Sequence, residues 1–366
     1  MKALGLMSGT SLDGIDLAVI ETDGERIEAL GPVLTVPHLP ATRAACREAS
    51  RLAAGWRPGN AVPDAVLDAA ARITEAHRLA IHHFLRQEDE AAGVEVIGFH
   101  GQTIMHRPGE GLTWQIGDAQ VLADEFGIDV VGQMRLADVR AGGQGAPLAP
   151  LYHRALASGL EGPVAVLNLG GVGNVTWIAP GAEPVAFDTG PGNALIDDWA
   201  LQHTGAPVDR DGALAGAGRI HHEVLAAMMD HPFFDEPAPK SLDRDDFSAA
   251  PARGLSPEDG AATLTAFTVE TVAAAGRHYP APVTRVLVTG GGRLNPVLMA
   301  MLEKRLGVSV EPVEAVGWRG DSLEAEAFGF LAVRSLKGLP LSVPGTTGVP
   351  RPLTGGQLFR PRRMSR

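Results

Sequence analysis

Three glycine-rich turns, each following a short apolar run, constrain the fold of this chain more than any other feature. They span residues 9–14, 170–174 and 290–292. Glycine lets the backbone approach a ligand closely, and exposed main-chain amides in such turns bind phosphate oxygens without a basic side chain. None of the three has the Gly-Lys-Ser/Thr ending of a P-loop or the Gly-x-Gly-x-x-Gly pattern before a helix. A single turn of this kind is typical of a plain hairpin, but three together favour a duplicated α/β fold. In such a fold two hairpins hold nucleotide phosphates and the third turn holds the adenosine.

Apolar periodicity between the turns predicts alternating strands and helices. The expected strands are 4–7, 15–21, 94–99 ending at His100, 164–169, 175–178, 185–187 and 285–288. The expected helices are 64–86, 118–126, from about 148, from 193, after a proline-containing cap at 256–259, from 296, and from about 321 to 337. A glycine-rich joint at 140–147 predicts two lobes, residues 1–145 and 146–366. The Pro- and Gly-rich tail, 338–366, is expected to pack back on the first lobe.

Length and charge limit the partners. A chain of 366 residues exceeds the usual size of one hydrophobic core. Its net charge of −12 argues against nucleic-acid and anionic-membrane partners. One cysteine allows no intrachain disulfide, and polar residues directly after Met7 make the start too short for a signal peptide. We expect a cytoplasmic protein without membrane or nucleic-acid partners, and a homodimer stays open as its assembly.

Six motifs occur in the same order as in a known family. They are residues 8–16 (SGTSLDGID), 100–103 (HGQT), 142–147 (GGQGAP), 168–171 (NLGG), 187–193 (FDTGPGN) and 290–292 (GGG). The set resembles the anhydro-N-acetylmuramic acid kinases, members of the sugar-kinase, heat-shock ATPase and actin superfamily. The resemblance implies a two-lobed actin-like ATPase fold with duplicated mixed-sheet domains and a central nucleotide cleft. It also implies an ATP- and Mg²⁺-dependent kinase. Such an enzyme opens the 1,6-anhydro bond of the anhydro amino sugar with water and phosphorylates the 6-oxygen, in peptidoglycan recycling.

The turns and the resemblance together name the candidate site residues. The nucleotide-binding candidates belong to the three turns: Gly9, Thr10, Ser11, Leu12, Asp13, Gly14, Ile15, Asp16, Gly170, Gly171, Asn174, Gly290, Gly291 and Gly292. The sugar-binding candidates are His100, Gln102, Thr103, Gln144, Gly190, Asn193 and Glu324. Asp188 is implied as the general base that takes a proton from the attacking water, a task that needs a carboxylate.

Several candidates also fit a purely structural role. Asp188 is suited to an Asx turn that orders the next loop, and Glu324 to a capping box begun by Asp321. Asp13 belongs to an Asp-Gly hairpin turn, where its carboxylate can also hold magnesium through water. His100 is either a sugar contact or a brace for the loop that follows it.

Two other functions remain open from the residues alone. One is an ordinary sugar kinase of the same fold, which needs no water and opens no ring. The other is a non-catalytic regulator that senses ATP or a sugar, although the chain has no basic DNA-binding segment. Gln133 and Met134 stand where the family often has Asp-Phe, which leaves a sugar contact from Gln133 without support from the family pattern.

Overall fold

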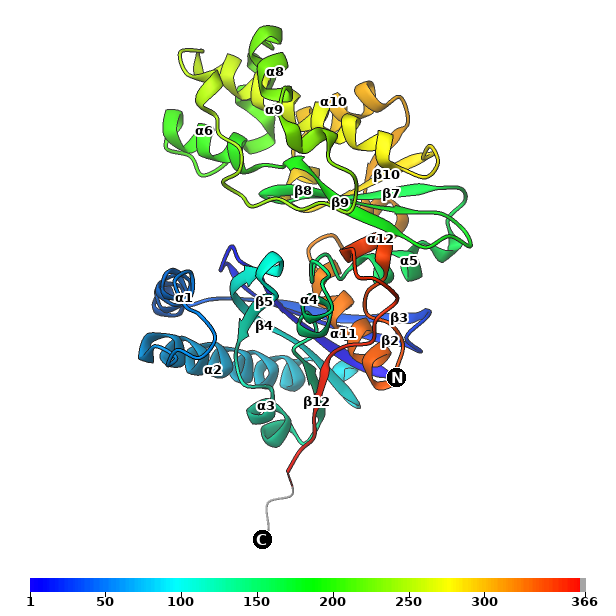
Figure 1. The fold of residues 1–366 in the computed structure, drawn as a ribbon. Coiled ribbons are helices and arrows are strands. Elements are labelled where there is room, and N and C mark those ends of the chain that lie inside the picture. The colour runs from blue at the N-terminus through cyan, green and yellow to red at the C-terminus, as the bar shows by residue number, and fades with distance from the viewer. Residues whose placement is uncertain (363–366) are drawn as a thin grey trace. The chain divides into compact units, whose positions relative to one another are not determined.

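A computed structural model describes residues 1–362 and divides into two compact units (Figure 1). The second unit is Ala157–Asp321, and the first unit consists of Met1–Leu156 together with the chain from Ser322 onward. This division differs from the expected lobes 1–145 and 146–366, because the segment after Ser322 builds part of the first core. The second unit is therefore an insertion between two segments of the first.

The first unit is built on a mixed sheet in the order β12-β6-β4-β1-β2-β3, with β5 paired to β4. Its strands are β1 Lys2–Ser8, β2 Gly14–Thr22, β3 Ile27–Pro37, β4 Val96–Arg107, β5 Leu112–Ile116, β6 Asp129–Gly132 and β12 Gln357–Phe359. β1, β2 and β3 form an antiparallel meander, and β4 and β6 continue the sheet parallel to β1. The tail returns to this unit, because β12 pairs with β6.

The second unit repeats the design in the order β11-β10-β7-β8-β9. Its strands are β7 Val164–Leu169, β8 Val172–Ile178, β9 Val185–Pro191, β10 Arg285–Thr289 and β11 Ser309–Pro312. β7, β8 and β9 form the meander, and β10 and β11 continue the sheet parallel to β7. The same order and the same strand directions in both units confirm the expected duplicated mixed-sheet α/β fold of the actin-like ATPase class.

The two faces of the first sheet are covered by different helices, because side chains alternate along a strand. Leu4 and Leu6 of β1 and Ile97 of β4 pack in one core with Ile81 and Phe84 of α2. The helices of this unit are α1 Pro40–Ala53, α2 Asp64–Gln87, α3 Ala119–Phe126, α4 Leu136–Arg140, α5 Pro150–Leu156, α11 Leu323–Leu336 and α12 Pro344–Thr347.

On the other face, glycines let α11 lie directly on the strands. A Cβ on Gly5 would lie 1.7 Å from the carbonyl oxygen of Ala325, and one on Gly98 would lie 2.1 Å from that of Phe328. No side chain fits at either position, so the backbone of α11 is in contact with β1 and β4. This contact is the physical reason why the chain after Ser322 belongs to the first unit.

The second unit packs α9 and α10 on its sheet. Val269 and Val272 of α9 and Leu298 of α10 share a core with Leu167 of β7 and Val288 of β10. The helices here are α6 Ala194–Thr204, α7 Ala213–Ala217, α8 His222–Met229, α9 Pro257–Ala275 and α10 Pro296–Leu306. The expected cap of α9 is confirmed, because the side chain of Ser256 accepts a hydrogen bond from the Asp259 amide.

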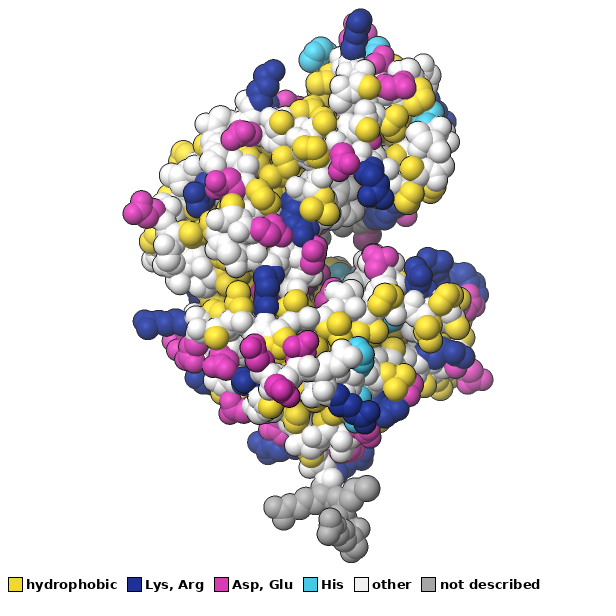
Figure 2. Space-filling model, turned by 180° about the vertical axis from the view of Figure 1, so that it is seen from behind, with side chains coloured by type: hydrophobic (Ala, Val, Ile, Leu, Met, Phe, Trp, Pro, Cys, Tyr) yellow, Lys and Arg dark blue, Asp and Glu magenta, His cyan; other side chains and the backbone are white. Residues whose placement is uncertain are grey.

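The surface is charged and mixed. On the face shown in Figure 2, acidic and basic side chains both occur on each unit. No helix among residues 1–362 is both long enough and apolar enough to cross a membrane.

Candidate active site

The first glycine turn joins β1 to β2, and the side chain of Gln102 forms hydrogen bonds to it. The Ser8 hydroxyl donates to Gln102 Oε1 at 2.6 Å, and Gln102 Nε2 donates to the carbonyl of Gly9 at 3.1 Å. Leu12 closes the turn with a bond from its amide to the Gly9 carbonyl, 3.1 Å, and a positive φ of 61°. Gln102 is 1% exposed, so the structure places this sugar-binding candidate as a brace of the first glycine turn.

The candidates in this turn differ in whether the packing of the fold alone explains the residue type at their position. Gly9 has no positive φ, and a Cβ there would meet only the Ser11 hydroxyl, at 3.7 Å. Gly14 is structural, because its Cβ would lie 2.5 Å from the carbonyl of Val36. Ile15 is 1% exposed and belongs to the core. The packing of the fold therefore does not itself require glycine at residue 9.

The two acidic residues of the turn differ in exposure and in hydrogen bonding. Asp13 is exposed, whereas a carboxylate oxygen of Asp16 accepts from the Thr35 hydroxyl of β3 at 2.6 Å. Thr10 and Ser11 are exposed as well, so their hydroxyls and amides are accessible to a phosphate. Residues 1–362 contain no group of three or more His, Cys, Asp or Glu side chains that could hold a metal ion by themselves.

His100 lies inside a polar corner of the first unit. β4 does not end at His100 as expected but continues to Arg107, because β5 pairs with it. Arg135 Nε donates to His100 Nε2 at 3.1 Å, and Arg135 also donates to the carbonyl of Gly145 at 2.9 Å. Burial, reinforced by the Arg135 charge, holds the pKa of His100 well below its usual range. His100 is therefore a neutral imidazole whose Nε2 accepts.

Phe328 and Glu324 of α11 complete this corner. The rings of His100 and Phe328 have centroids 4.6 Å apart, and the Arg135 guanidinium lies 5.8 Å from the Phe328 ring centroid. Glu324 is exposed in the first turn of α11, within electrostatic range of Arg135. The expected capping box is wrong: the N-cap is Ser322 without a side-chain cap bond, and Asp321 pairs with Arg293 instead.

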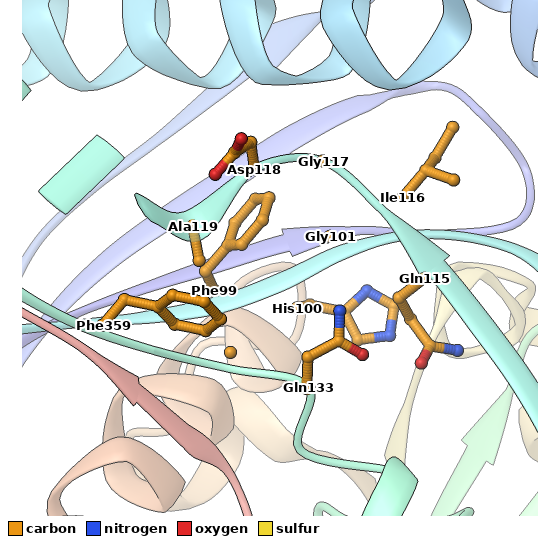
Figure 3. A pocket seen from close by; sticks show the side chains of 11 residues that line it. Phe99, His100, Gly101, Gln115, Ile116, Gly117, Asp118, Ala119, Gln133 and Phe359 are labelled. Carbon is orange, nitrogen blue, oxygen red and sulfur yellow. The ribbon is translucent and has the colours of Figure 1, made fainter. Parts of the chain in front are cut away.

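A pocket of about 170 Å³ opens beside His100. Figure 3 shows the side chains of His100, Gln115 and Gln133 on one side of it and those of Phe99 and Phe359 on the other. Gln115 Oε1 is buried without a hydrogen-bond partner, while Gln115 Nε2 donates to the hydroxyls of Thr103 and Thr113 at 3.2 and 2.8 Å. No local pattern predicts Gln115 or Phe359 in this pocket, because the pairing of β5 with β4 and of β12 with β6 brings them here.

Gln144 lies in the joint between α4 and α5. Its amide donates to the carbonyl of Thr347 at 2.7 Å, and its carbonyl accepts from His106 Nε2 at 2.8 Å. The same joint is held by the buried carboxylate of Asp138, which accepts from the amide of Gly145 at 2.6 Å and from the hydroxyl of Thr347 at 2.7 Å. The main chain of Gln144 is thus fixed by the first unit.

The second glycine turn lies in the second unit and is tied to the end of β9. The Gly192 amide donates to the Gly171 carbonyl at 2.9 Å, and the Asn193 amide donates to the Gly170 carbonyl at 2.7 Å. The Asn193 side chain adds a bond to the carbonyl of Leu169 at 2.7 Å. A Cβ on Gly170 or Gly171 would meet nothing closer than 3.8 Å, as at Gly9 in the first turn.

The third turn lies against the second. Gly290 has a φ of +74°, and a Cβ there would lie 2.4 Å from the Asn168 side chain. A Cβ on Gly292 would lie 2.5 Å from the Leu169 side chain, and one on Gly291 would be 3.6 Å from Asn193 Nδ2. The structure therefore brings the second turn, the third turn and Asn193 into one site.

Arg293 was not expected in this site. Its side chain is 5% exposed, and it donates to the carbonyl of Gly290 at 3.0 Å, to Glu314 at 2.9 Å and to Asp321 at 2.8 Å. These bonds fix the third turn. No local pattern marks them, because the two acidic partners are distant in sequence.

Asp188 lies on β9 as a half-buried residue, and a later loop bonds to its main chain and to its carboxylate. Its amide donates to the carbonyl of Lys240 at 2.9 Å, and its Oδ2 accepts from the amide of Leu242 at 2.8 Å. Burial raises the pKa of the Asp188 carboxyl to about 7; the Leu242 amide opposes this rise and the nearby Asp243 charge adds to it. A carboxylate with this pKa can accept a proton near neutral pH. The fold itself requires glycine at residue 190, since a Cβ there would lie 2.6 Å from Thr271.

Known proteins match the chain over nearly its whole length. A family model described as "Anhydro-N-acetylmuramic acid kinase" matches residues 1–361. A protein of that name from Rhizorhabdus wittichii is 56% identical over 363 residues, covering 99% of each chain. Another from Rhodospirillum rubrum is 57% identical over 355 residues, covering 97% of this chain and 93% of the relative. The solved structure of a Streptomyces griseus glucokinase in complex with glucose and AMPPNP is 14% identical, with a TM-score of 0.39 over 91% of this chain and 99% of the other. With a family match over residues 1–361 and relatives more than half identical, the chain belongs to the anhydro-N-acetylmuramic acid kinase family.

Proposed function

We propose that this protein is an ATP-dependent kinase that opens 1,6-anhydro-N-acetylmuramic acid with water and phosphorylates its 6-oxygen. The product is N-acetylmuramic acid 6-phosphate, and the reaction serves peptidoglycan recycling. The observation that carries the proposal is the state of Asp188: in a chain of this family, the amide and the carboxylate of Asp188 each bond to the main chain of one loop, and burial raises the pKa of the carboxyl to about 7.

Asp188 acts as the general base. It takes one proton from a water whose oxygen forms a bond to the anomeric carbon, and the bond from that carbon to the 6-oxygen breaks. The 6-oxygen forms a bond to the γ-phosphorus of ATP as the bond to the leaving ADP oxygen breaks. One sugar, one ATP and one water give one sugar phosphate and one ADP, and the proton leaves Asp188 for solvent. Holding these groups in place supplies most of the catalysis in phosphoryl transfer.

The glycine turns bind the phosphates. Gly9, Gly170 and Gly171 leave open space where a side chain would stand, so phosphate oxygens can approach the amides. The third turn, 290–292, fixed by Arg293, carries the adenosine. Asn174 and Asn193 line the second turn, and Thr10 and Ser11 supply donors in the first.

Magnesium fits beside the first turn. Asp13 is an exposed carboxylate there, and Mg²⁺ on a nucleotide is typically held by phosphate oxygens and waters with one or two carboxylates. Asp13 would hold the ion through water, and the ion would neutralise charge on the phosphates. A protein that uses ATP in this way works in the cytoplasm.

The first unit binds the sugar. His100, Arg135 and Glu324 form one polar corner, and the neighbouring pocket adds Gln115 and Gln133. An amino sugar with hydroxyl, acetamido and carboxylate groups needs such a mixture of donors and acceptors. Buried polar groups that pair with a substrate group give strong discrimination, because an analogue without that group leaves them unpaired.

Isotope labelling tests the proposal. The enzyme is supplied with ATP, Mg²⁺ and the anhydro sugar in ¹⁸O-water, and the product is analysed by mass spectrometry and NMR. We expect one ¹⁸O at the anomeric carbon and phosphate on the 6-oxygen. An ordinary sugar kinase would instead phosphorylate an open sugar and incorporate no ¹⁸O. A regulator would bind ligands and release no ADP.

A further inference from the structure

A buried lysine holds the loop that clamps Asp188. Lys240 is 9% exposed, and its ammonium donates to the carbonyls of Phe233 at 2.7 Å and Phe234 at 3.4 Å. The ammonium also lies 4.3 Å from the centroid of the Phe233 ring. A buried cation needs donors satisfied by acceptors, and here main-chain carbonyls and a ring face satisfy them. The ammonium therefore points into the protein, toward Phe233 and Phe234.

The residues that receive the ammonium are firmly anchored. Phe233 and Phe234 are both buried in a cluster with Phe267 of α9. Their rings contact each other with centroids 5.7 Å apart, and Phe234 lies 6.1 Å from Phe267 by the same measure. Lys240 thus ties its own loop to a packed aromatic core of the second unit.

The backbone around Lys240 meets Asp188 twice. The Lys240 carbonyl accepts from the Asp188 amide at 2.9 Å, and two residues later the Leu242 amide donates to Asp188 Oδ2 at 2.8 Å. One residue therefore contacts the aromatic core with its side chain and the strand of the base with its main chain. Movement of Lys240 would move the donor that orients the carboxylate.

We propose that Lys240 is a positioning residue, whose ammonium anchors the loop at Phe233 and Phe234 so that the Leu242 amide stays on the carboxylate of Asp188. The kinetic part of this inference depends on the proposed role of Asp188 as base. The structural part does not.

The loop also supplies groups that change the pKa of the Asp188 carboxyl. From the loop, Asp243 raises the pKa of the Asp188 carboxyl and the Leu242 amide lowers it. From β8 the residue opposite is the uncharged Asn174, and from α9 the uncharged Thr271 lies against Gly190. Loss of the Leu242 hydrogen bond would therefore raise the pKa of Asp188 further.

The test compares Lys240→Met and Lys240→Gln with wild type, with Lys304→Met, an exposed lysine of α10, as the control. Amide hydrogen exchange of the ligand-free protein is measured by NMR, together with the pH profile of kcat/KM. In Lys240→Met we expect the amides of Leu242 and Asp188, which both bond across this loop, to exchange at least about tenfold faster, while the other β9 amides are unchanged. We expect the acidic limb of the profile to move up by about half a pH unit or more. The kcat should fall roughly 10- to 100-fold, with a smaller change in the KM for the sugar.

Lys240→Gln keeps an amide donor without the charge, so intermediate effects are expected, and it carries the test if Lys240→Met does not fold. The inference is overturned if, in a folded variant, the Leu242 amide exchanges at the wild-type rate and the acidic limb of the kcat/KM profile lies at the wild-type pH. A loss of activity accounted for entirely by a smaller folded fraction would overturn it as well. Because exchange is measured without ligands, a failed ¹⁸O experiment with fast Leu242 exchange would reject only the proposed reaction.

Discussion

Asn174 and Asp188 face each other in the β8–β9 ladder, next to an irregularity in the register between Gly173 and Asn174. Residues directly opposite in antiparallel strands project from the same face with their Cβ atoms about 5 Å apart. The residue that ends the second glycine turn and the proposed base are therefore on one ladder. A shift of this turn would therefore displace the side chain of Asp188.

Replacement of Asp188 by asparagine should remove the base and keep the fold. The amide has nearly the same size and one acceptor oxygen for the Leu242 amide, but it cannot accept a proton near neutral pH. Loss of a general base costs about 10²- to 10⁴-fold in rate. We expect kcat to fall by that factor, with the dissociation constants of ATP and sugar within about threefold of wild type. Asp245→Asn, an exposed position, is the control. A folded variant that binds both ligands and turns over within tenfold of wild type would contradict the assignment.

Activity should rise with pH through the pKa of Asp188. The base works only when ionised, and its pKa is about 7. The kcat/KM should therefore increase about tenfold per pH unit below that value and level off above it. A profile already flat from pH 5 upward would show that the ionisation of Asp188 does not limit the reaction.

The same pKa makes a prediction for stability. The folded-state pKa of about 7 lies above the ordinary value of 3.8. Between these values the folded protein holds a proton that the unfolded chain has released, so the contribution of Asp188 to stability falls as pH rises through this window. Asp188→Asn should remove this slope and raise the melting temperature relative to wild type at pH 8. Denaturation curves recorded between pH 5 and 8 give the free energy of unfolding of both proteins. The same dependence of this free energy on pH in wild type and Asp188→Asn would contradict the prediction.

Alanine at Gly9 or Gly171 should separate nucleotide binding from folding. Neither added Cβ meets a chain atom closer than 3.7 Å, so both variants should melt near the wild-type temperature. Each methyl would stand where a phosphate oxygen approaches, and we expect ATP affinity to fall at least about tenfold with little change for the sugar. Calorimetry measures both affinities.

Gly192 is the matched control for that experiment. Its Cβ would lie 2.3 Å from the carbonyl of Gly170, so Gly192→Ala should lower the melting temperature itself. Unchanged ATP affinity in both Gly9→Ala and Gly171→Ala would reject the assignment of these turns to phosphate.

Asp13→Asn should raise the magnesium requirement. The carboxylate is exposed at the first turn, so its loss removes a charge near the phosphates without a folding cost. We expect half-maximal activity to need several-fold more Mg²⁺, with the same maximal rate at saturation. Glu25→Gln in the β2–β3 connection controls for the change in net charge. If Asp13→Asn and wild type need the same Mg²⁺ concentration for half-maximal activity, Asp13 does not help to hold the ion.

The local features of this fold were predictable, and the distant pairings were not. The hairpins at the first two glycine turns, the helix from Asp64 and the Ser256 cap follow from short-range patterns, and all are present. The roles of Gln102 and Glu324 depend on contacts far along the chain. Gln102 belongs to the HGQT motif, yet its side-chain amide is bonded to Ser8 of β1 and to Gly9 in the turn after it.

The candidate base shows the same limit. A carboxylate after a predicted strand was visible in the sequence, but its pKa is raised by burial in the folded chain, and its main-chain donor is Leu242, more than 50 residues later. Local spacing does not determine which backbone amide meets a side chain at that distance. Arg293 was missed for the same reason, because its partners Glu314 and Asp321 come from later turns.

The bare glycines of β1 and β4 set an order of assembly. Gly5 and Gly98 are among the first residues to leave the ribosome, and the helix backbone that covers them, around Ala325 and Phe328, is among the last. The whole of Ala157–Asp321 is synthesised in between, so the inserted unit can complete its core first. During that interval the first sheet has one face without a cover. A released chain that ends before residue 322 would thus contain one complete unit and one sheet with an uncovered face, the kind of surface that holding chaperones bind.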